Sequence, residues 1–228
     1  MNVKQNKTGD LRAAIGFLLA FALWTALIRA VDVQAAGANG TSVGFAAFNL
    51  WFHRLTGVHM TVYTVTDWLG LVPIAVCLCF GVLGAAQLVR RRSPLRVDPD
   101  ILLLGLYYLL VIFAYLFFEM VPVNYRPILI DGALEASYPS STTLLVLSVM
   151  PTLKLQIDRR AENPSLRRIN DLFVIAFSAF MVIGRLLSGV HWATDIIGAI
   201  LLSAGLYLLY RHCVRQIDQH RENANGFS

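Results

Sequence analysis

The sequence predicts an all-α integral membrane protein: a bundle of six transmembrane helices, with a short interfacial amphipathic helix between the first and second. Of its 228 residues, 57% are hydrophobic and only 14% are charged. Soluble domains carry about 25% charged residues, so this composition suits a lipid environment. The apolar residues form runs that can cross a bilayer, and the basic residues gather between them. Nothing indicates a second domain, and residues 1–228 are predicted to form one membrane domain.

Six apolar runs are the predicted spans, since one crossing needs about 20 residues. The first run is longer than the apolar core of an ordinary signal peptide, so we interpret it as a retained helix. The fourth run is shorter than the first three and is interrupted by Pro151 and Lys154. The six runs cover residues 11–31, 69–88, 101–121, 142–157, 172–187 and 196–210.

Residues 32–67 are less regular. Within them, residues 43–55 mix aromatic and other large apolar side chains with Asn49, His53 and Arg54; the notable apolar ones are Phe45, Phe48, Leu50, Trp51 and Phe52. This pattern is typical of a helix that lies in the membrane interface. Asp67 and Trp68 at the end of this region fit an interfacial aromatic belt.

The basic residues predict the orientation. If residue 1 is cytoplasmic, the cytoplasmic segments hold all but four of the 19 Lys and Arg residues. Cytoplasmic loops carry this excess of positive charge, so both termini are predicted to be cytoplasmic. Short loops and the absence of retention signals favour a bacterial cell membrane. The four basic residues on the other side are Arg29, Arg54, Arg126 and Arg185.

The stretch 184–195, between the last two runs, carries Arg185, His191 and Asp195. His191 and Asp195 are four residues apart, so on a helix they would share one face and the carboxylate could reach the imidazole. Ser188 and Gly189 are a point where a helix could end and the chain turn back. Ionisable groups at membrane helix ends tend to be functional, and this combination suits phosphate chemistry at a membrane surface.

Two further polar clusters are predicted on the same side of the membrane. One runs from Glu119 to Pro127 and contains Arg126, whose planar guanidinium suits phosphate oxygens, as does that of Arg185. The other, residues 138–143, opens the fourth span. A helix N-terminus favours phosphate, so the predicted phosphate-binding residues there are Ser140, Ser141 and Thr142.

The three clusters together resemble the signature motifs of the phosphatidic acid phosphatase type 2 superfamily of membrane lipid phosphatases. Those motifs read K-x6-R-P, P-S-G-H and S-R-x5-H-x3-D, and the resemblance covers a phosphatase-like core of about residues 100–210. It implies hydrolysis of a lipid phosphate on the extracytoplasmic side, with no metal or other cofactor. It also implies that His191 is the nucleophile, forming a phosphohistidine, and that Asp195 orients its ring.

This chain departs from the family pattern at three places. Glu119 stands seven residues before Arg126, where the first motif has Lys. Ser141 and Thr142 replace the Gly-His of the second motif, whose His serves the family as general acid. Gly184 replaces the Ser that begins the third motif.

These departures leave three interpretations. In the first, the leaving group needs no proton: phosphate leaving from a diphosphate is already a weak base, so the enzyme prefers a polyprenyl or other lipid diphosphate to phosphatidic acid. In the second, Glu119 (if burial keeps it protonated), His53 or His59 supplies the proton. In the third, catalysis is lost and the cleft binds a lipid headgroup or a partner protein. A lipid phosphotransferase on the same fold is a further alternative.

Other features predict no function. The basic residues form no patch with interleaved aromatics, which argues against nucleic acid. Cys77, Cys79 and Cys213 have no metal-ligand spacing and imply no disulfide framework. Asp131 and Glu135 are four apart, but with no third ligand beside them they are interpreted as solvated loop charges.

Overall fold

The computed structural model describes the backbone of residues 3–225 and the side chains of residues 9–223, and in this part of the chain it consists almost wholly of helices. Two short strands pair antiparallel between the first two helices, and two short 3-10 turns, Ala38–Gly40 and Pro94–Arg96, lie in loops. The α-helices and strands are α1 (Val3–Ala30), β1 (Gln34–Ala35), β2 (Ser42–Val43), α2 (Ala46–Thr56), α3 (Met60–Leu69), α4 (Leu71–Arg91), α5 (Pro99–Met120), α6 (Ser141–Arg160), α7 (Pro164–Leu187) and α8 (Ala193–Asn225).

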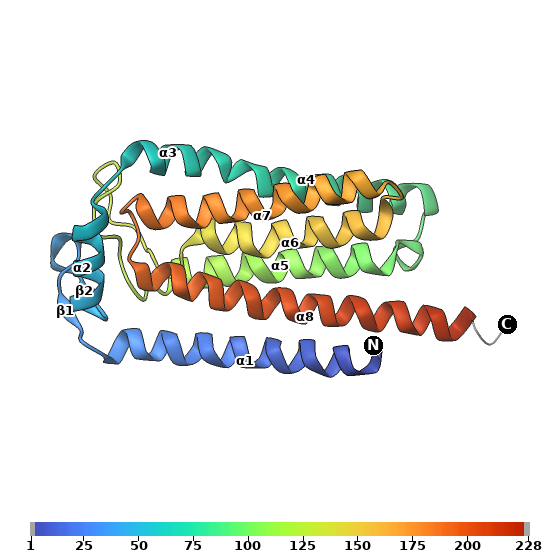
Figure 1. The fold of residues 1–228 in the computed structure, drawn as a ribbon, viewed down its shortest axis with the longest axis horizontal. Coiled ribbons are helices and arrows are strands. Elements are labelled where there is room, and N and C mark those ends of the chain that lie inside the picture. Colours follow the sequence, from blue (N-terminus) through green and yellow to red (C-terminus); the bar gives the residue numbers. More distant parts are fainter. Residues whose placement is uncertain (1–2, 226–228) are drawn as a thin grey trace.

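The long helices run side by side (Figure 1). α6 lies at the centre and packs against α4, α5, α7 and α8, whereas α1 packs along α8. The start of α1 and the end of α8 lie at one end of the bundle, and α2 lies at the other (Figure 1). At the α2 end, the connection from α5 to α6 and the turn from α7 to α8 come together.

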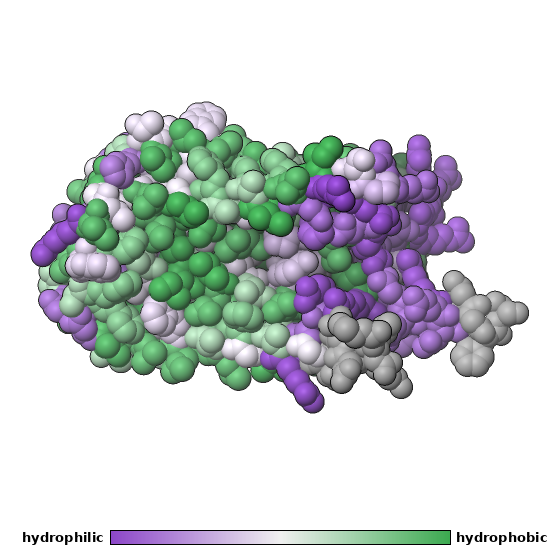
Figure 2. Space-filling view, in the orientation of Figure 1, coloured by the Kyte–Doolittle hydropathy of each residue, from purple (hydrophilic) through white to green (hydrophobic). Residues whose placement is uncertain are grey.

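Five helices are long and apolar enough to cross a membrane, by length and composition: Gly9–Ala30, Met60–Arg91, Pro99–Met120, Pro164–Leu187 and Ala193–Asn223. They confirm a multi-span helical membrane protein. The predicted fourth span forms α6, which is not among the five. A hydrophobic band covers the middle of the molecule and hydrophilic residues gather at the end where α1 begins (Figure 2).

α6 is more polar than its neighbours because those neighbours, and not lipid, cover it. Nine of its residues are buried, among them Ser148, Thr152 and Gln156. Tyr hydroxyl groups satisfy several of these polar groups: Tyr108 bonds Thr152 at 2.8 Å, and Gln156 donates to Tyr210 at 2.8 Å. The helix continues through Pro151, so the predicted interruption there was wrong.

The second predicted span began nine residues too late. α3 and α4 follow each other directly through Gly70, so the helical segment starts at Met60. Polar side chains on α3, Thr66 and Asp67 among them, lowered the hydropathy of its sequence, but these two contact another helix of the bundle. A helix, α2, does occupy the place of the predicted interfacial segment; its position in a membrane remains a prediction.

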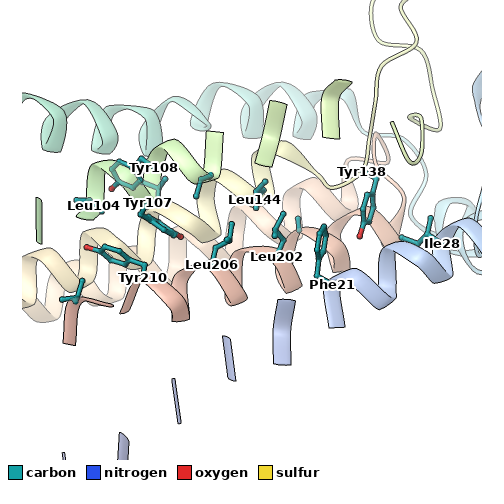
Figure 3. Close-up of a cluster of buried hydrophobic side chains, with 14 residues drawn as sticks. Phe21, Ile28, Leu104, Tyr107, Tyr108, Tyr138, Leu144, Leu202, Leu206 and Tyr210 are labelled. Atoms are coloured by element: carbon teal, nitrogen blue, oxygen red, sulfur yellow. The ribbon is translucent and has the colours of Figure 1, made fainter. Parts of the chain in front are cut away.

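The main core lies among α1, α5, α6 and α8 (Figure 3). Tyr107 stacks on Tyr210 with ring centroids 4.8 Å apart, and Phe21 of α1 stacks on Tyr138 at 6.0 Å. Tyr138 belongs to the connection before α6, and its hydroxyl also bonds Thr25 at 2.7 Å. This packing ties the connection between α5 and α6 to the bundle.

Candidate active site

His191 lies in the tight turn between α7 and α8. α7 ends at Leu187 and α8 begins at Ala193, so His191 precedes the helix, and the prediction that it shares a helix face with Asp195 was wrong. Gly189 makes the turn possible: its φ is +71°, and a Cβ there would lie 2.1 Å from the carbonyl oxygen of Gly57. Only glycine allows this approach without strain.

A backbone carbonyl orients the imidazole of His191. Nδ1 lies 3.1 Å from the carbonyl oxygen of Ser137 and donates to it, because a carbonyl only accepts. The nearest Asp195 oxygen is 3.8 Å from Nδ1. Asp195 instead accepts hydrogen bonds from the Trp192 amide at 2.9 Å and from Asn124 at 3.1 Å. The carboxylate therefore holds the turn and the neighbouring loop, and it acts on the imidazole from a longer distance.

With Nδ1 protonated, the lone pair of His191 is on Nε2, and this buried atom has no hydrogen-bond partner among the described residues. Burial lowers the pKa of His191 to about 4; the nearby carboxylate of Asp195 opposes this shift, and the charges of Arg126 and Arg185 add to it. The imidazole is therefore neutral at neutral pH, which is the form that acts as a nucleophile.

The loop between α5 and α6 folds back on itself and carries Arg126. Backbone hydrogen bonds join the amide of Arg126 to the carbonyl of Glu135 at 3.1 Å and the amide of Ser137 to the carbonyl of Asn124 at 2.9 Å. Nε of Arg126 forms an ion pair with Glu135 at 3.0 Å. Since Asn124 also binds Asp195, it ties this loop to the turn of His191.

Arg185 is almost fully buried near the end of α7 and is held by side chains from α3 and α6. Its Nη2 donates to Thr142 at 2.6 Å and lies 3.3 Å from Asp67, while Nη1 lies 3.5 Å from Thr66. The guanidinium also lies over the ring of Tyr63, 4.8 Å from its centroid.

The three residues predicted to bind phosphate at the start of α6 differ in their surroundings. The hydroxyl of Ser140 is buried and donates to Thr143 at 3.1 Å, so it is engaged within the helix start. Thr142 holds Arg185. Ser141 is half-buried and lines the cavity described next. Its backbone amide belongs to the first turn of α6, where amides lack helical partners.

A mostly polar cavity of about 190 Å³ lies where the loop between α5 and α6, the start of α6 and the turn of His191 meet. His191, Arg126 and Ser141 line it, together with Ser137, Glu119 and Glu135. Glu119 is exposed, so it lacks the burial on which its predicted role as proton donor depended. His53 and His59 do not line the cavity: they bond the backbone carbonyls of Gly189 and Thr56 at 3.0 and 2.8 Å.

Two sequence interpretations are corrected here. Glu135 is not a solvated loop charge, because it pairs with Arg126, and Asp67 is not simply part of an interfacial belt, because it reaches Arg185. Tyr63, Thr66 and Asn124 also contact site residues and were not predicted. Tyr63, Thr66 and Asp67 are spaced three and four residues apart, which places them on one face of α3, and this spacing was the available signal.

The structure explains why glycine, and not the family's Ser, stands at position 184. α7 and α3 approach so closely that a Cβ at Gly184 would lie 2.7 Å from Cγ2 of Thr66. Gly184→Ser is therefore expected to lower the free energy of unfolding by about 1–3 kcal/mol, the usual effect of overpacking. Thr66→Ser, which removes Cγ2 and keeps the hydroxyl, is expected to recover part of that loss when combined with it.

Unfolding curves of the purified protein in detergent test this expectation. Gly105→Ser is the matched control, because a Cβ there meets nothing within 4 Å. Equal stability of the Gly184→Ser and Gly105→Ser variants would show that the close approach of α3 and α7 does not exclude a side chain.

Comparison with known proteins gives two matches. A family model described as the PAP2 superfamily matches residues 100–218. Among solved structures, the chain is similar to one described as the "first transmembrane PAP2 type phosphatidylglycerolphosphate phosphatase from Bacillus subtilis". The TM-score is 0.64 at 16% sequence identity, over 90% of this chain and 96% of that chain, which shows a shared fold. No curated protein matches the sequence.

Proposed function

The chain belongs to the PAP2 superfamily, whose members are phosphatases, and on that premise we propose that it hydrolyses a lipid diphosphate through a phosphohistidine at His191. The preferred substrate is a polyprenyl or other lipid diphosphate, and the reaction takes place on the extracytoplasmic side of the membrane without a metal ion.

One observation carries the proposal. Apart from Nε of Arg126, which forms an ion pair with Glu135, four buried polar atoms at the site lack a hydrogen-bond partner among the described residues: Nε2 of His191, Nη1 of Arg126, Nε of Arg185 and the hydroxyl of Ser137. Leaving such groups unpaired typically costs about 1–3 kcal/mol each, and more when the group is charged. A bound phosphate would accept from the guanidinium and hydroxyl groups, and its phosphorus would face the lone pair of Nε2.

The reaction follows from this arrangement. Nε2 of His191 attacks the terminal phosphorus, the bond to the bridging oxygen breaks, and the lipid monophosphate leaves with the electron pair. Arg126 and Arg185 stabilise the charge on the phosphoryl oxygens. Water then attacks phosphorus, the P–N bond breaks, and inorganic phosphate and neutral His191 result. The leaving phosphate is a weak base, so the first step needs no proton donor where Thr142 replaces the family's His.

An apolar groove of about 390 Å³ supports a lipid as the rest of the substrate. It lies between α4, α5 and α6 and is lined by Ile74, Val111 and Ile112 among others. Tyr115 and Ser141 line both this groove and the polar cavity of His191. A substrate with its phosphate in the cavity would have an apolar path for its chain.

The charge distribution supports the proposed side of the membrane. The site lies at the α2 end of the bundle, away from the hydrophilic end where α1 starts and α8 finishes (Figures 1 and 2). The basic residues of that opposite end include Arg91, Arg92, Arg159 and Arg160. Excess Lys and Arg marks the cytoplasmic face, so this distribution supports a site on the opposite, extracytoplasmic face.

Phosphate release from matched lipids tests the substrate preference. With purified protein, a polyprenyl diphosphate is expected to give a kcat/KM about tenfold or more above the monophosphate of the same chain, because an alkoxide leaving group requires the missing acid. Phosphatidic acid is expected to behave like the monophosphate.

Equal or faster turnover of phosphatidic acid would reject the diphosphate preference and leave a phosphatase in place. No release from any lipid would favour headgroup binding. Loss of substrate without inorganic phosphate, accompanied by a phosphorylated acceptor, would identify a phosphotransferase.

A further inference from the structure

Each of the two arginines at the site is paired with a carboxylate that is far more exposed than the arginine. Arg185 is 1% exposed and its partner Asp67 is 57% exposed; Arg126 is 8% exposed and its partner Glu135 is 39% exposed. Such pairs are weak, because water screens the carboxylate that faces it. The carboxylates are therefore well suited to being exchanged for another anion.

Asp67 and Glu135 line different hollows beside the site. Asp67 lines the apolar groove between α4, α5 and α6, and Glu135 lines the polar cavity that contains His191. Asp67 lies on α3, outside the residues that the family model matches.

The pairs leave part of each guanidinium free. Nε of Arg185 and Nη1 of Arg126 are buried without a partner among the described residues. The ring of Tyr63 lies under both arginines: its centroid is 4.8 Å from Cζ of Arg185 and 5.8 Å from Cζ of Arg126. Each arginine thus has one end held by a carboxylate and another end available to a ligand.

We propose that Asp67 and Glu135 are exchangeable counterions: they hold Arg185 and Arg126 in the free protein and are replaced there by the phosphate of the substrate. The inference rests on the proposed function, since it takes the two arginines as phosphate ligands. A phosphate carries more charge than a carboxylate and presents more acceptor oxygens to a guanidinium, so it displaces the weaker pairs. The two carboxylates thereby lower the affinity for phosphate and keep two buried cations from repelling each other in the empty site.

Direct binding of inorganic phosphate and orthovanadate to the full-length protein in nanodiscs tests the proposal without relying on activity. Asp67→Asn and Glu135→Gln are each expected to bind about two- to fivefold more tightly, the range that corresponds to loss of a partly exposed ion pair. The two variants lie on different elements, and Asp67→Ser replaces Asp67→Asn if the latter does not fold.

Two matched controls separate exchange from a general change in charge. Glu119→Gln removes a carboxylate from the same cavity, but among the described residues Glu119 has no ion pair, so its effect is expected to be clearly smaller. Asp131→Asn removes an exposed charge from the same loop as Glu135 and is expected to have no effect.

Weaker binding in Asp67→Asn and Glu135→Gln, equal tightening in Glu119→Gln, or no binding to any form would overturn the proposal. The outcomes also distinguish it from the proposed function. Tighter binding in both variants without lipid hydrolysis would support the counterion role and reject the phosphatase. Lipid hydrolysis without tighter phosphate binding in the two variants would support the phosphatase and reject the counterion role.

Discussion

His191→Ala is expected to abolish phosphate release from every lipid substrate, a decrease of about 10³-fold or more, as loss of a nucleophile usually produces. His191 lines the polar cavity and its buried Nε2 has no hydrogen-bond partner, and among the described residues no other histidine lines that cavity. Inorganic phosphate release measures the effect. Acid-labile labelling of the protein by a substrate with radioactive terminal phosphate measures the intermediate, which the variant is expected to lack.

His220→Ala is the matched control, because His220 is exposed near the end of α8, at the opposite end of the bundle. It is expected to keep wild-type activity and labelling. Activity of the His191→Ala variant within tenfold of wild type would reject His191 as the nucleophile, and equal release by both would indicate a contaminating phosphatase.

Arg185→Lys is expected to lower kcat/KM about 10²-fold, although the charge is kept. Nη2 of the guanidinium contacts Thr142 and Asp67 and Nη1 contacts Thr66, while the group lies over the ring of Tyr63 and leaves Nε for a ligand. A lysine ammonium is a single point charge and cannot make these contacts together. Loss of one well-placed donor to transition-state charge typically costs about 10²–10³-fold in rate.

Steady-state kinetics of Arg185→Lys beside Arg54→Lys check this expectation. Arg54 is exposed on α2, on the same side of the bundle, and its replacement is expected to leave kcat/KM unchanged. A decrease of less than threefold in Arg185→Lys would mean that charge alone, and not the forked geometry, is what the site requires.

The membrane character and the family could be predicted from the sequence because their signals are local or additive. Long apolar runs identify helices without reference to their neighbours, and the family motif at Arg185, His191 and Asp195 lies within twelve residues. The recognition of the family is confirmed by the match over residues 100–218. Hydropathy failed where polar side chains face other helices. Thr66 and Asp67 delayed the predicted start of the second span, and α6, which forms the predicted fourth span, is not among the helices apolar enough to cross a membrane.

The sequence proposes the residues of the candidate site but does not predict the contacts between them. Spacing alone suggested that Asp195 would bind the ring of His191. In the structure the Ser137 carbonyl accepts the hydrogen bond from Nδ1, and Asp195 accepts hydrogen bonds from Asn124 and the Trp192 amide. Ser137 lies 54 residues away along the chain. No local pattern can show that two such segments meet.

By itself, then, the sequence determined a helical membrane protein, its family and the residues that could act on phosphate, since composition, periodicity and motif spacing are properties of the chain. Only the tertiary structure decided how those residues are held. It paired Arg126 with Glu135 and Arg185 with Asp67, placed α3 against α7 at Gly184, and left Nε2 of His191 unpaired in the cavity. These contacts depend on which helices pack together and at what distance, and that is settled by the packing of the whole bundle.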